Sequence, residues 1–146
     1  MSYTSLIYHI AFATKDRRPQ VTDELRPRLC QYIGGIIRDE GGQMLEANGP
    51  ADHIHVAAIV PPTVAIASFL RDLKAGSSRW VHDTFANGRD FGWQDGYAAF
   101  TVSRSGLPKL LAYIRNQQEH HKTVTFREEL IALLERHGIE YDERYL

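Results

Sequence analysis

Two short runs of the sequence carry side chains that could do chemistry together. His53 and His55 are separated by one residue, and Tyr113 lies four positions before Gln117. On a β-strand, side chains two positions apart point to the same face with Cα atoms about 6.5–7 Å apart, so two imidazoles can converge on one cation. On a helix, residues i and i+4 are neighbours. Asp52 precedes the histidine pair and is a candidate partner for one imidazole.

These residue types are suited to breaking a phosphodiester. A phenol has a pKa near 10, so Tyr113 needs assistance to attack at neutral pH. A divalent ion held by His53, His55 and the Gln117 oxygen would leave positions open for a phosphate. Nitrogen and oxygen ligands without a thiolate suit Mg²⁺ or Mn²⁺, although two histidines alone would equally admit Zn²⁺. Each motif by itself also fits a structural role, as half-exposed strand histidines and as a core-boundary tyrosine with an exposed glutamine.

Hydrophobic periodicity predicts the elements that must position these side chains. Alternation over 3–13 indicates a strand, and the turn at Asn48-Gly49-Pro50 joins two further strands. Apolar residues at helical spacing indicate four helices. The expected order is strand 3–13, helix 23–40, strands 43–47 and 52–60, helix 63–81, strand 97–103, and helices 106–121 and 125–137.

This order predicts an α+β fold of the ferredoxin-like βαββαβ type, an antiparallel sheet with two helices on one face. Additional C-terminal helices follow, and the first carries Tyr113. The chain is expected to form a single domain over 1–146, with a core at about 3–121 and a C-terminal helix and acidic tail at about 125–146. A fold used for so many functions does not identify the chemistry.

Composition excludes several classes of protein. The 146 residues are 43% hydrophobic and 24% charged, which is typical of a globular chain. One cysteine, Cys30, excludes an internal disulfide and a cysteine-based zinc site. No apolar run approaches the roughly 18 residues of a membrane span, and no signal-peptide layout opens the chain. A cytoplasmic protein without a membrane partner is therefore expected.

The net charge of −1 hides an uneven distribution. Residues 101–127 carry five basic side chains against one acidic, whereas 128–146 carry six acidic against two basic. A local basic segment can attract phosphates, because salt screens surface charges beyond roughly 8–10 Å. On charge alone, the simpler interpretation is a solvated helix face.

The motifs and their order together resemble one family. His53-Ile54-His55, followed by Tyr113-Ile114-Arg115-Asn116-Gln117, resembles the HUH single-tyrosine transposases, which include those of the IS-two-hundred-type insertion sequences and the REP-associated tyrosine transposases. Further segments also resemble the family and occur in the same order along the chain. They are residues 8–12 and 14–19, residues 73–74 and 77–79, residues 93–97 and 100–103, and residues 120–121 and the tail from 126 to 146. The resemblance covers nearly the whole chain.

The resemblance implies a metal-dependent enzyme that cleaves single-stranded DNA and transfers the strand through a 5′-phosphotyrosine intermediate. Tyr113 would be the nucleophile, and His53, His55 and Gln117 would hold Mg²⁺ or Mn²⁺. The substrate would be DNA with hairpin ends. The protein would be a homodimer, and because the tyrosine helix of one subunit often completes the other subunit's site in this family, assembly in cis and in trans both stay open here. DNA affinity would depend on local basic groups. The candidates are Arg17, Arg18, Lys74, Arg79, Arg104 and Arg115.

Two other functions stay open at this point. One is a non-catalytic protein that binds single-stranded nucleic acid on the same ferredoxin-like scaffold, which the basic segment favours. The other is a ferredoxin-like oligomer that binds a small metabolite or a metal. Cleavage of a hairpin would distinguish the enzyme from both, and DNA binding that is insensitive to a chelator would favour the first.

Overall fold

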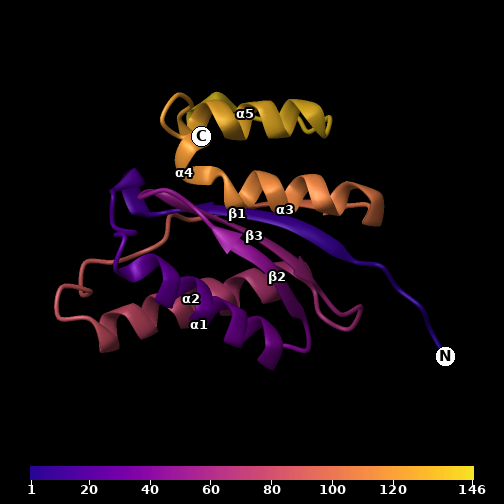
Figure 1. Ribbon diagram of the computed structural model, residues 1–146, viewed down its shortest axis with the longest axis horizontal. Helices are drawn as coiled ribbons and strands as arrows, with labels where there is room; N and C mark the ends of the chain where they lie inside the picture. Colours follow the sequence, from indigo (N-terminus) through magenta and orange to yellow (C-terminus); the bar gives the residue numbers. More distant parts are fainter.

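The computed structural model describes all 146 residues and contains one four-stranded antiparallel sheet with helices on both faces (Figure 1). The strands are β1 (Ile7–Ala13), β2 (Gln43–Asn48), β3 (His53–Ile59) and β4 (Ala98–Val102). Their order in the sheet is β2-β3-β1-β4, so the first and third strands lie in the middle. This arrangement confirms the ferredoxin-like α+β prediction.

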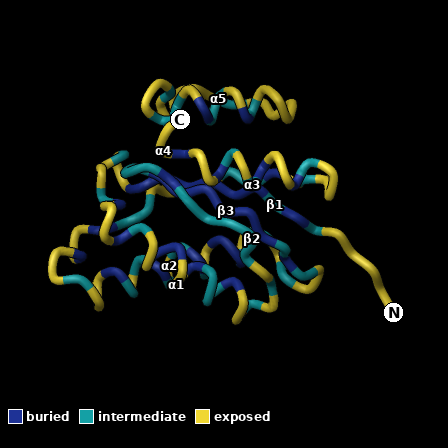
Figure 2. The backbone as a smooth tube through the Cα atoms, viewed as in Figure 1, coloured by how far each residue is buried: buried dark blue, intermediate teal, exposed yellow.

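Helices α1 (Leu25–Asp39) and α2 (Ile66–Thr84) cover one face of the sheet (Figure 1). The main hydrophobic core lies between them and the strands, where Ile10 and Val56 of the central strands pack with Ile33 and Leu70 of the helices. Burial of this apolar surface is the main force that holds the layer together. The strands and the inner sides of these helices are correspondingly buried (Figure 2).

The opposite face carries the C-terminal helices α3 (Leu107–Arg115), α4 (Gln117–His120) and α5 (Phe126–Arg136). Helix α3 packs against Ile7 and Ala57, and α5 buries Phe126 against Ala11 and Ala13. Short 3₁₀ turns lie at Lys15–Arg17, Arg104–Gly106 and Glu143–Tyr145. The sheet is therefore covered on both faces, and the histidine-bearing side of β3 lies under α3, α4 and α5.

The helix predicted over 106–121 is interrupted at Asn116, so the expectation of one continuous helix was wrong. The side-chain amide of Asn48, at the end of β2, donates to the backbone carbonyls of Ile114 and Arg115 at 3.0 and 3.2 Å. The same side chain exchanges hydrogen bonds with Gln118. These contacts satisfy carbonyls at the end of α3 and allow the chain to turn before α4.

Two further boundaries differ from the predictions. The first strand begins at Ile7 rather than at residue 3, and the preceding residues extend from the body (Figures 1 and 2), where Tyr3 is exposed and does not pair with the sheet. Helix α2 begins at Ile66 instead of residue 63. No helix in the structure is both long enough and apolar enough to span a membrane.

Candidate metal centre and catalytic tyrosine

His53 and His55 lie side by side on β3, facing the C-terminal helices, and both are 0% exposed. The alternative of half-exposed strand histidines was therefore wrong. The small residues Ala13 and Ala11 of β1 stand opposite them in the sheet register and leave room for the imidazoles. A tight turn precedes the pair, since a Cβ atom at Gly49 would collide with the carbonyl oxygen of His53.

Each imidazole is oriented by a partner on the side away from α5. His53 Nδ1 lies 2.7 Å from the Oδ1 of Asp52, to which it donates, and His55 Nδ1 lies 2.7 Å from His9 Nε2 on β1. Such partners fix the orientation of an imidazole and the nitrogen that remains for a ligand. In both histidines that nitrogen is Nε2, and both point toward α5.

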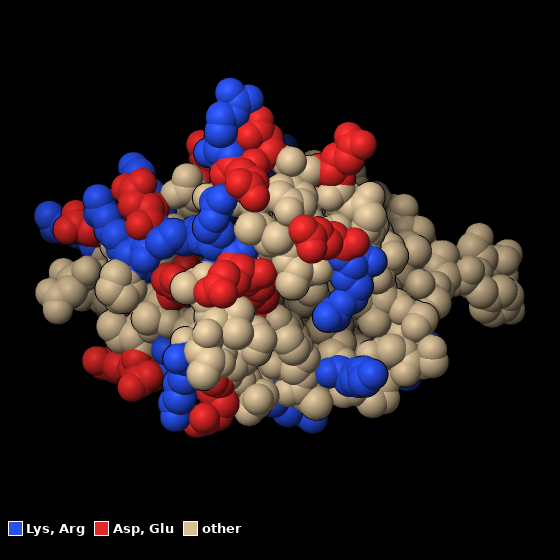
Figure 3. Space-filling model, turned by 90° about the horizontal axis from the view of Figure 1, so that it is seen from above, with Lys and Arg blue, Asp and Glu red and all other residues tan.

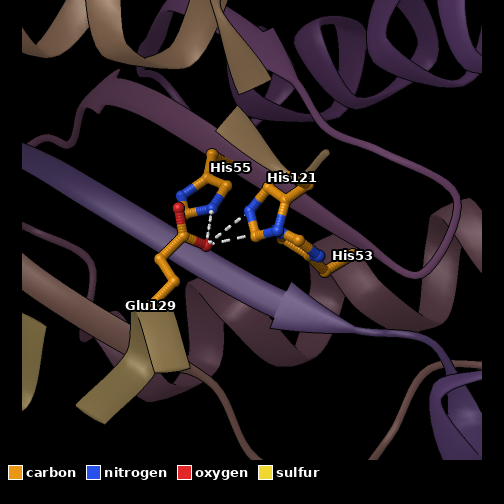
Figure 4. A group of neighbouring side chains, drawn as sticks. All are labelled: His53, His55, His121 and Glu129. Carbon is orange, nitrogen blue, oxygen red and sulfur yellow. Dashed lines mark hydrogen bonds and ion pairs between the residues drawn. The ribbon is translucent and has the colours of Figure 1, made fainter. Parts of the chain in front are cut away.

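Glu129 of α5 occupies the centre of this site (Figure 4). Its Oε1 lies 2.8 Å from His55 Nε2, 3.2 Å from His53 Nε2 and 3.1 Å from His121 Nε2. Its Oε2 accepts hydrogen bonds from the Tyr113 hydroxyl and from the Gln117 amide. The carboxylate is only 3% exposed, so α5 closes the site from above.

The local sequence of α5 explains how a glutamate comes to be buried there. Thr125 and Glu128 form a capping box that fixes the first turn of the helix. Phe126, Glu129 and Leu133 follow at the spacing of one helix face, and all three are buried. Phe126 packs on the imidazole of His53 with ring centroids 4.2 Å apart, which seats the first turn over the sheet.

Tyr113 and Gln117 meet the histidines within the same chain. The Tyr113 ring lies perpendicular to that of His55, with centroids 5.8 Å apart. Gln117 is buried, and its Oε1 lies 3.3 Å from His53 Nε2. The alternative of an exposed glutamine was therefore wrong. The phenol, the carboxamide and both imidazoles that the sequence singled out share one centre, joined through Glu129.

Burial and hydrogen bonding shift the ionisation of this centre. Burial alone would raise the pKa of Glu129, but hydrogen bonds from three imidazoles outweigh it and hold that pKa far below the usual range. Burial lowers the pKa of His55, whereas two carboxylate neighbours overcome burial and raise the pKa of His53. Burial and then Glu129 raise the pKa of Tyr113. At neutral pH the site thus combines an ionised carboxylate with a protonated phenol.

The donor atoms fit a divalent cation. Ligand atoms of His53, His55, His121 and Glu129 all lie within 4.8 Å of one another. His53 donates from Nδ1 to Asp52, so its neutral form carries a lone pair at Nε2. That lone pair faces the oxygen atoms of Gln117 and Glu129, which would repel it. A proton or a metal cation bound at Nε2 would relieve this repulsion. Imidazole nitrogens with one carboxylate form a set used by Mn²⁺, Zn²⁺ and similar ions.

Of the six residues that were expected to bind DNA, Arg17 is the one that lies against this centre. Asp16 and Arg17 both adopt left-handed backbone conformations, with φ of 56° and 55°. Such conformations are costly for residues other than glycine. They turn the Arg17 guanidinium over the ring of Phe126, 4.6 Å from its centroid, and Phe126 in turn packs on His53.

The other five expected DNA-binding residues are dispersed. Lys74 is held by the protein, donating to two backbone carbonyls in the loop before β4, and Arg115 pairs with a carboxylate of β2 at 2.6 Å. Arg18 pairs loosely with a neighbouring aspartate. The remaining two, Arg79 and Arg104, are exposed. Figure 3 shows basic and acidic side chains interspersed over the face above α3 and α5, with the basic ones gathered mainly toward the left.

Glu129 and His121 are the site residues that sequence reasoning did not assign to the metal. Glu129 belongs to the acidic C-terminal tail, for which the sequence indicated no site role, yet its side chain is buried. One local signal could have identified it. A glutamate stands at an apolar-stripe position between Phe126 and Leu133, where burial requires a polar partner.

Comparisons with known proteins identify the family. The model of the IS200-like transposases matches residues 2–117. The transposase of insertion sequence IS200 from Salmonella typhimurium is 33% identical over 121 residues, covering 79% of this chain and 78% of that protein. A crystal structure of a candidate transposase from Deinococcus radiodurans R1 has a TM-score of 0.64 at 26% identity, covering 80% of this chain and 95% of that one. A REP-associated tyrosine transposase bound to a REP hairpin has a TM-score of 0.61 at 16% identity, covering 85% and 76%.

The matched region contains His53, His55, Tyr113 and Gln117, and it ends before His121 and Glu129. The family residues thus come from the shared core, while α5 adds a carboxylate from outside it. The family match over most of the chain and the transposase-like fold confirm the resemblance read from the motifs. The chain belongs to the IS200-like transposases, the HUH single-tyrosine transposase family.

Proposed function

We propose that this protein cleaves single-stranded DNA at hairpin ends and transfers the strand, using Tyr113 as the nucleophile and a divalent metal ion. The observation that carries this proposal is the Glu129 carboxylate, which contacts the Tyr113 hydroxyl through one oxygen and both His53 and His55 through the other. The proposed nucleophile and the side chains that would bind the metal ion thereby lie together in a chain of the transposase family.

His53, His55 and Gln117 are the proposed ligands from the family core, with Glu129 and His121 as further donors from the C-terminal segment. A set with up to three imidazoles suits Mn²⁺ better than Mg²⁺, which prefers oxygen ligands and retains water. When bound, the ion supplies charge neutralisation and polarisation of the scissile phosphate. Asp52 holds His53 in the orientation that this ligation requires.

In the proposed step, Tyr113 Oη forms a bond to phosphorus and the bond from phosphorus to the 3′-oxygen breaks. The phenolic proton is released, and the 3′-oxygen ends as a hydroxyl, so the exchange needs no co-reactant. The 5′-phosphotyrosine retains the energy of the phosphodiester, and attack by a 3′-hydroxyl of another strand reverses the step and joins the DNA. The Tyr113 hydrogen bond to Glu129 must open for the attack.

The negative charge of Glu129 explains why the reaction should require a cation. The Glu129 carboxylate is ionised and adjacent to the phenol. A phosphate approaching Tyr113 would meet this negative charge in a buried setting, where repulsion is screened less than in water. The neighbouring imidazoles offset this negative charge only to the extent that they are protonated. A divalent cation bound at the cluster would outweigh the negative charge and attract the phosphate, so a chelator should abolish the reaction.

The test is a covalent-adduct assay. The protein is incubated with Mn²⁺ and labelled single-stranded DNA hairpins, including any palindrome found beside its coding sequence, and the products are separated on a denaturing gel. We expect a slowly migrating protein–DNA band that disappears with EDTA and in Tyr113→Phe. Tyr32→Phe is the matched control, because Tyr32 lies on α1 across the sheet.

An adduct that persists in Tyr113→Phe would refute the assignment of the nucleophile. DNA binding that is indifferent to EDTA, with no adduct from any hairpin, would favour the non-catalytic single-strand binder instead. A protein that does not bind DNA even at low salt would be neither the proposed enzyme nor the single-strand binder.

A further inference from the structure

A groove separate from the histidine cluster opens beside Tyr113. It has a volume of about 360 Å³ and lies between the end of β4, α3 and the C-terminal end of α5. Tyr113 forms part of its wall, with Lys109 from α3, Arg136 from the last turn of α5 and His137 directly after that helix. The groove therefore reaches the proposed nucleophile from the side of the β4 edge, away from the Arg17 loop.

The lysine and the arginine that line this groove give it a positive charge. Its lining contains no aspartate or glutamate, and Lys109 and Arg136 are both exposed and make no ion pair or side-chain hydrogen bond. By contrast, Lys74 and Arg115 are held by partners within the protein. Two free cations facing one groove that contains no carboxylate make a site for an anion.

Arg136 lines the same groove as the phenol of Tyr113. An anion bound between Lys109 and Arg136 would therefore lie beside the proposed nucleophile. Gly106, the residue before the N-terminal end of α3, also borders the groove, so the helix dipole adds positive potential there.

The rest of the lining suits a nucleoside. The His137 ring stacks on Phe100 with centroids 4.2 Å apart, and Leu110 and Leu133 add apolar surface. Aromatic and apolar surfaces of this kind accept bases without reading their sequence. The volume lies at the small end of the range for ligand pockets, which fits a single nucleotide and excludes a duplex.

We propose that this groove binds a nucleotide of the single strand adjoining the scissile phosphate, with Lys109 and Arg136 on its phosphates. The inference rests on the proposed function and adds to it the path that the DNA strand takes across the protein. Arg136 and His137 lie beyond the region matched by the family model, so half of this subsite comes from α5. Helix α5 would then contribute both a metal donor and a strand contact.

The test measures binding in a Tyr113→Phe background, where no adduct forms. The probes are a fluorescein-labelled DNA hairpin with randomised single-stranded flanks and the same hairpin without flanks, compared by anisotropy over a range of salt. The variant is Lys109→Gln/Arg136→Gln. The matched control, Arg38→Gln/Arg71→Gln, removes two positive charges from α1 and α2 across the sheet.

We expect the groove variant to lose about 10-fold or more in affinity for the flanked hairpin, because hydrogen bonds between charged groups are lost. The salt slope should fall by about 1.4, corresponding to roughly 0.7 per single-strand phosphate contact. Affinity for the unflanked hairpin and for either probe in the control variant should change little. Equal losses on both probes, or no loss on either, would overturn the inference.

The two proposals fail separately. If the native enzyme forms the Tyr113 adduct but the groove variant binds both probes as the parent does, only the strand path is wrong. If no adduct forms with any DNA, the proposed enzyme is wrong, and the difference between flanked and unflanked probes still decides whether the groove binds a strand.

Discussion

Oε1 of Glu129 lies 2.8 Å from Nε2 of His55, although the two residues are 74 positions apart in the sequence. The contact joins α5 to the central part of the sheet, and the same carboxylate accepts a hydrogen bond from Tyr113. The C-terminal helix is therefore part of the proposed catalytic centre, and its removal would expose both imidazoles and free the phenol.

Replacing Glu129 by glutamine should weaken metal binding. The substitution keeps the shape of the side chain but removes the negative charge and one strong donor from the cluster. Loss of partners that merely orient a ligand costs about 10- to 100-fold in affinity, and loss of a donor should cost at least that much. Isothermal titration of the metal-free protein with Mn²⁺ measures the change.

The control for that measurement is Glu140→Gln, the same chemical change at an exposed residue with no ion pair. It should bind Mn²⁺ as the native protein does. Native-like affinity in Glu129→Gln would mean that the ion is held by the family core alone, and that Glu129 serves only to pair the imidazoles.

The stability of the metal-free protein should fall as the pH drops below about 6.5. Burial and the neighbouring His55 lower the pKa of His9 from 6.5 to about 3. Between those values the unfolded chain binds a proton that the folded chain does not, so the free energy of unfolding decreases with falling pH, by at most about 1.4 kcal/mol per pH unit for one proton. His53 acts in the opposite sense, but only above about pH 6.5, because its folded pKa is raised.

Urea unfolding in EDTA between pH 6.5 and 4.5 checks this expectation. His9→Gln should reduce the acid dependence, and the part that remains is due to His55, whose pKa is also lowered by burial. His82→Gln, at an exposed position on α2, should leave the acid dependence unchanged. The window lies above the usual pKa of a glutamate, so Glu129 contributes little to the slope there. An unchanged slope in His9→Gln would contradict the buried, neutral state of that imidazole.

The active site should work within one chain. The family resemblance implies a homodimer and leaves open whether its site is assembled in cis or in trans, and Tyr113 here lies beside the imidazoles of its own chain. A mixture of Tyr113→Phe and His53→Ala, each inactive alone, should therefore form no more adduct than either variant separately. Recovery of the adduct in the mixture would show that one subunit's tyrosine acts on the partner's metal site.

Local patterns were sufficient for much of the fold and for part of the site. Alternation along β3 placed His53 and His55 on one face, because this depends only on the geometry of one strand. Helical spacing predicted that Tyr113 lies near Gln117, and both contact Glu129 although the break at Asn116 places them on α3 and α4. The pairing of the strand motif with the helix motif came from the family resemblance. The structure then brought all four side chains together.

The features that the sequence did not reveal depend on distant residues. The break at Asn116 follows from Asn48, whose amide reaches carbonyls more than 60 positions away. Glu129 stands on the apolar stripe of α5, which is a local signal, but its imidazole partners come from β3 and from the segment after α4. No window of neighbouring residues contains that information.

Peptide mapping of the covalent adduct tests the central claim most directly. The native protein is incubated with Mn²⁺ and a single-stranded hairpin substrate, digested with trypsin and nuclease, and analysed by mass spectrometry. We expect the nucleotide mass on the peptide that contains Tyr113, attached through its phenolic oxygen, and no modified peptide in EDTA. A nucleotide attached to any other residue, or DNA cleaved by the native protein without an attached peptide, would contradict the account.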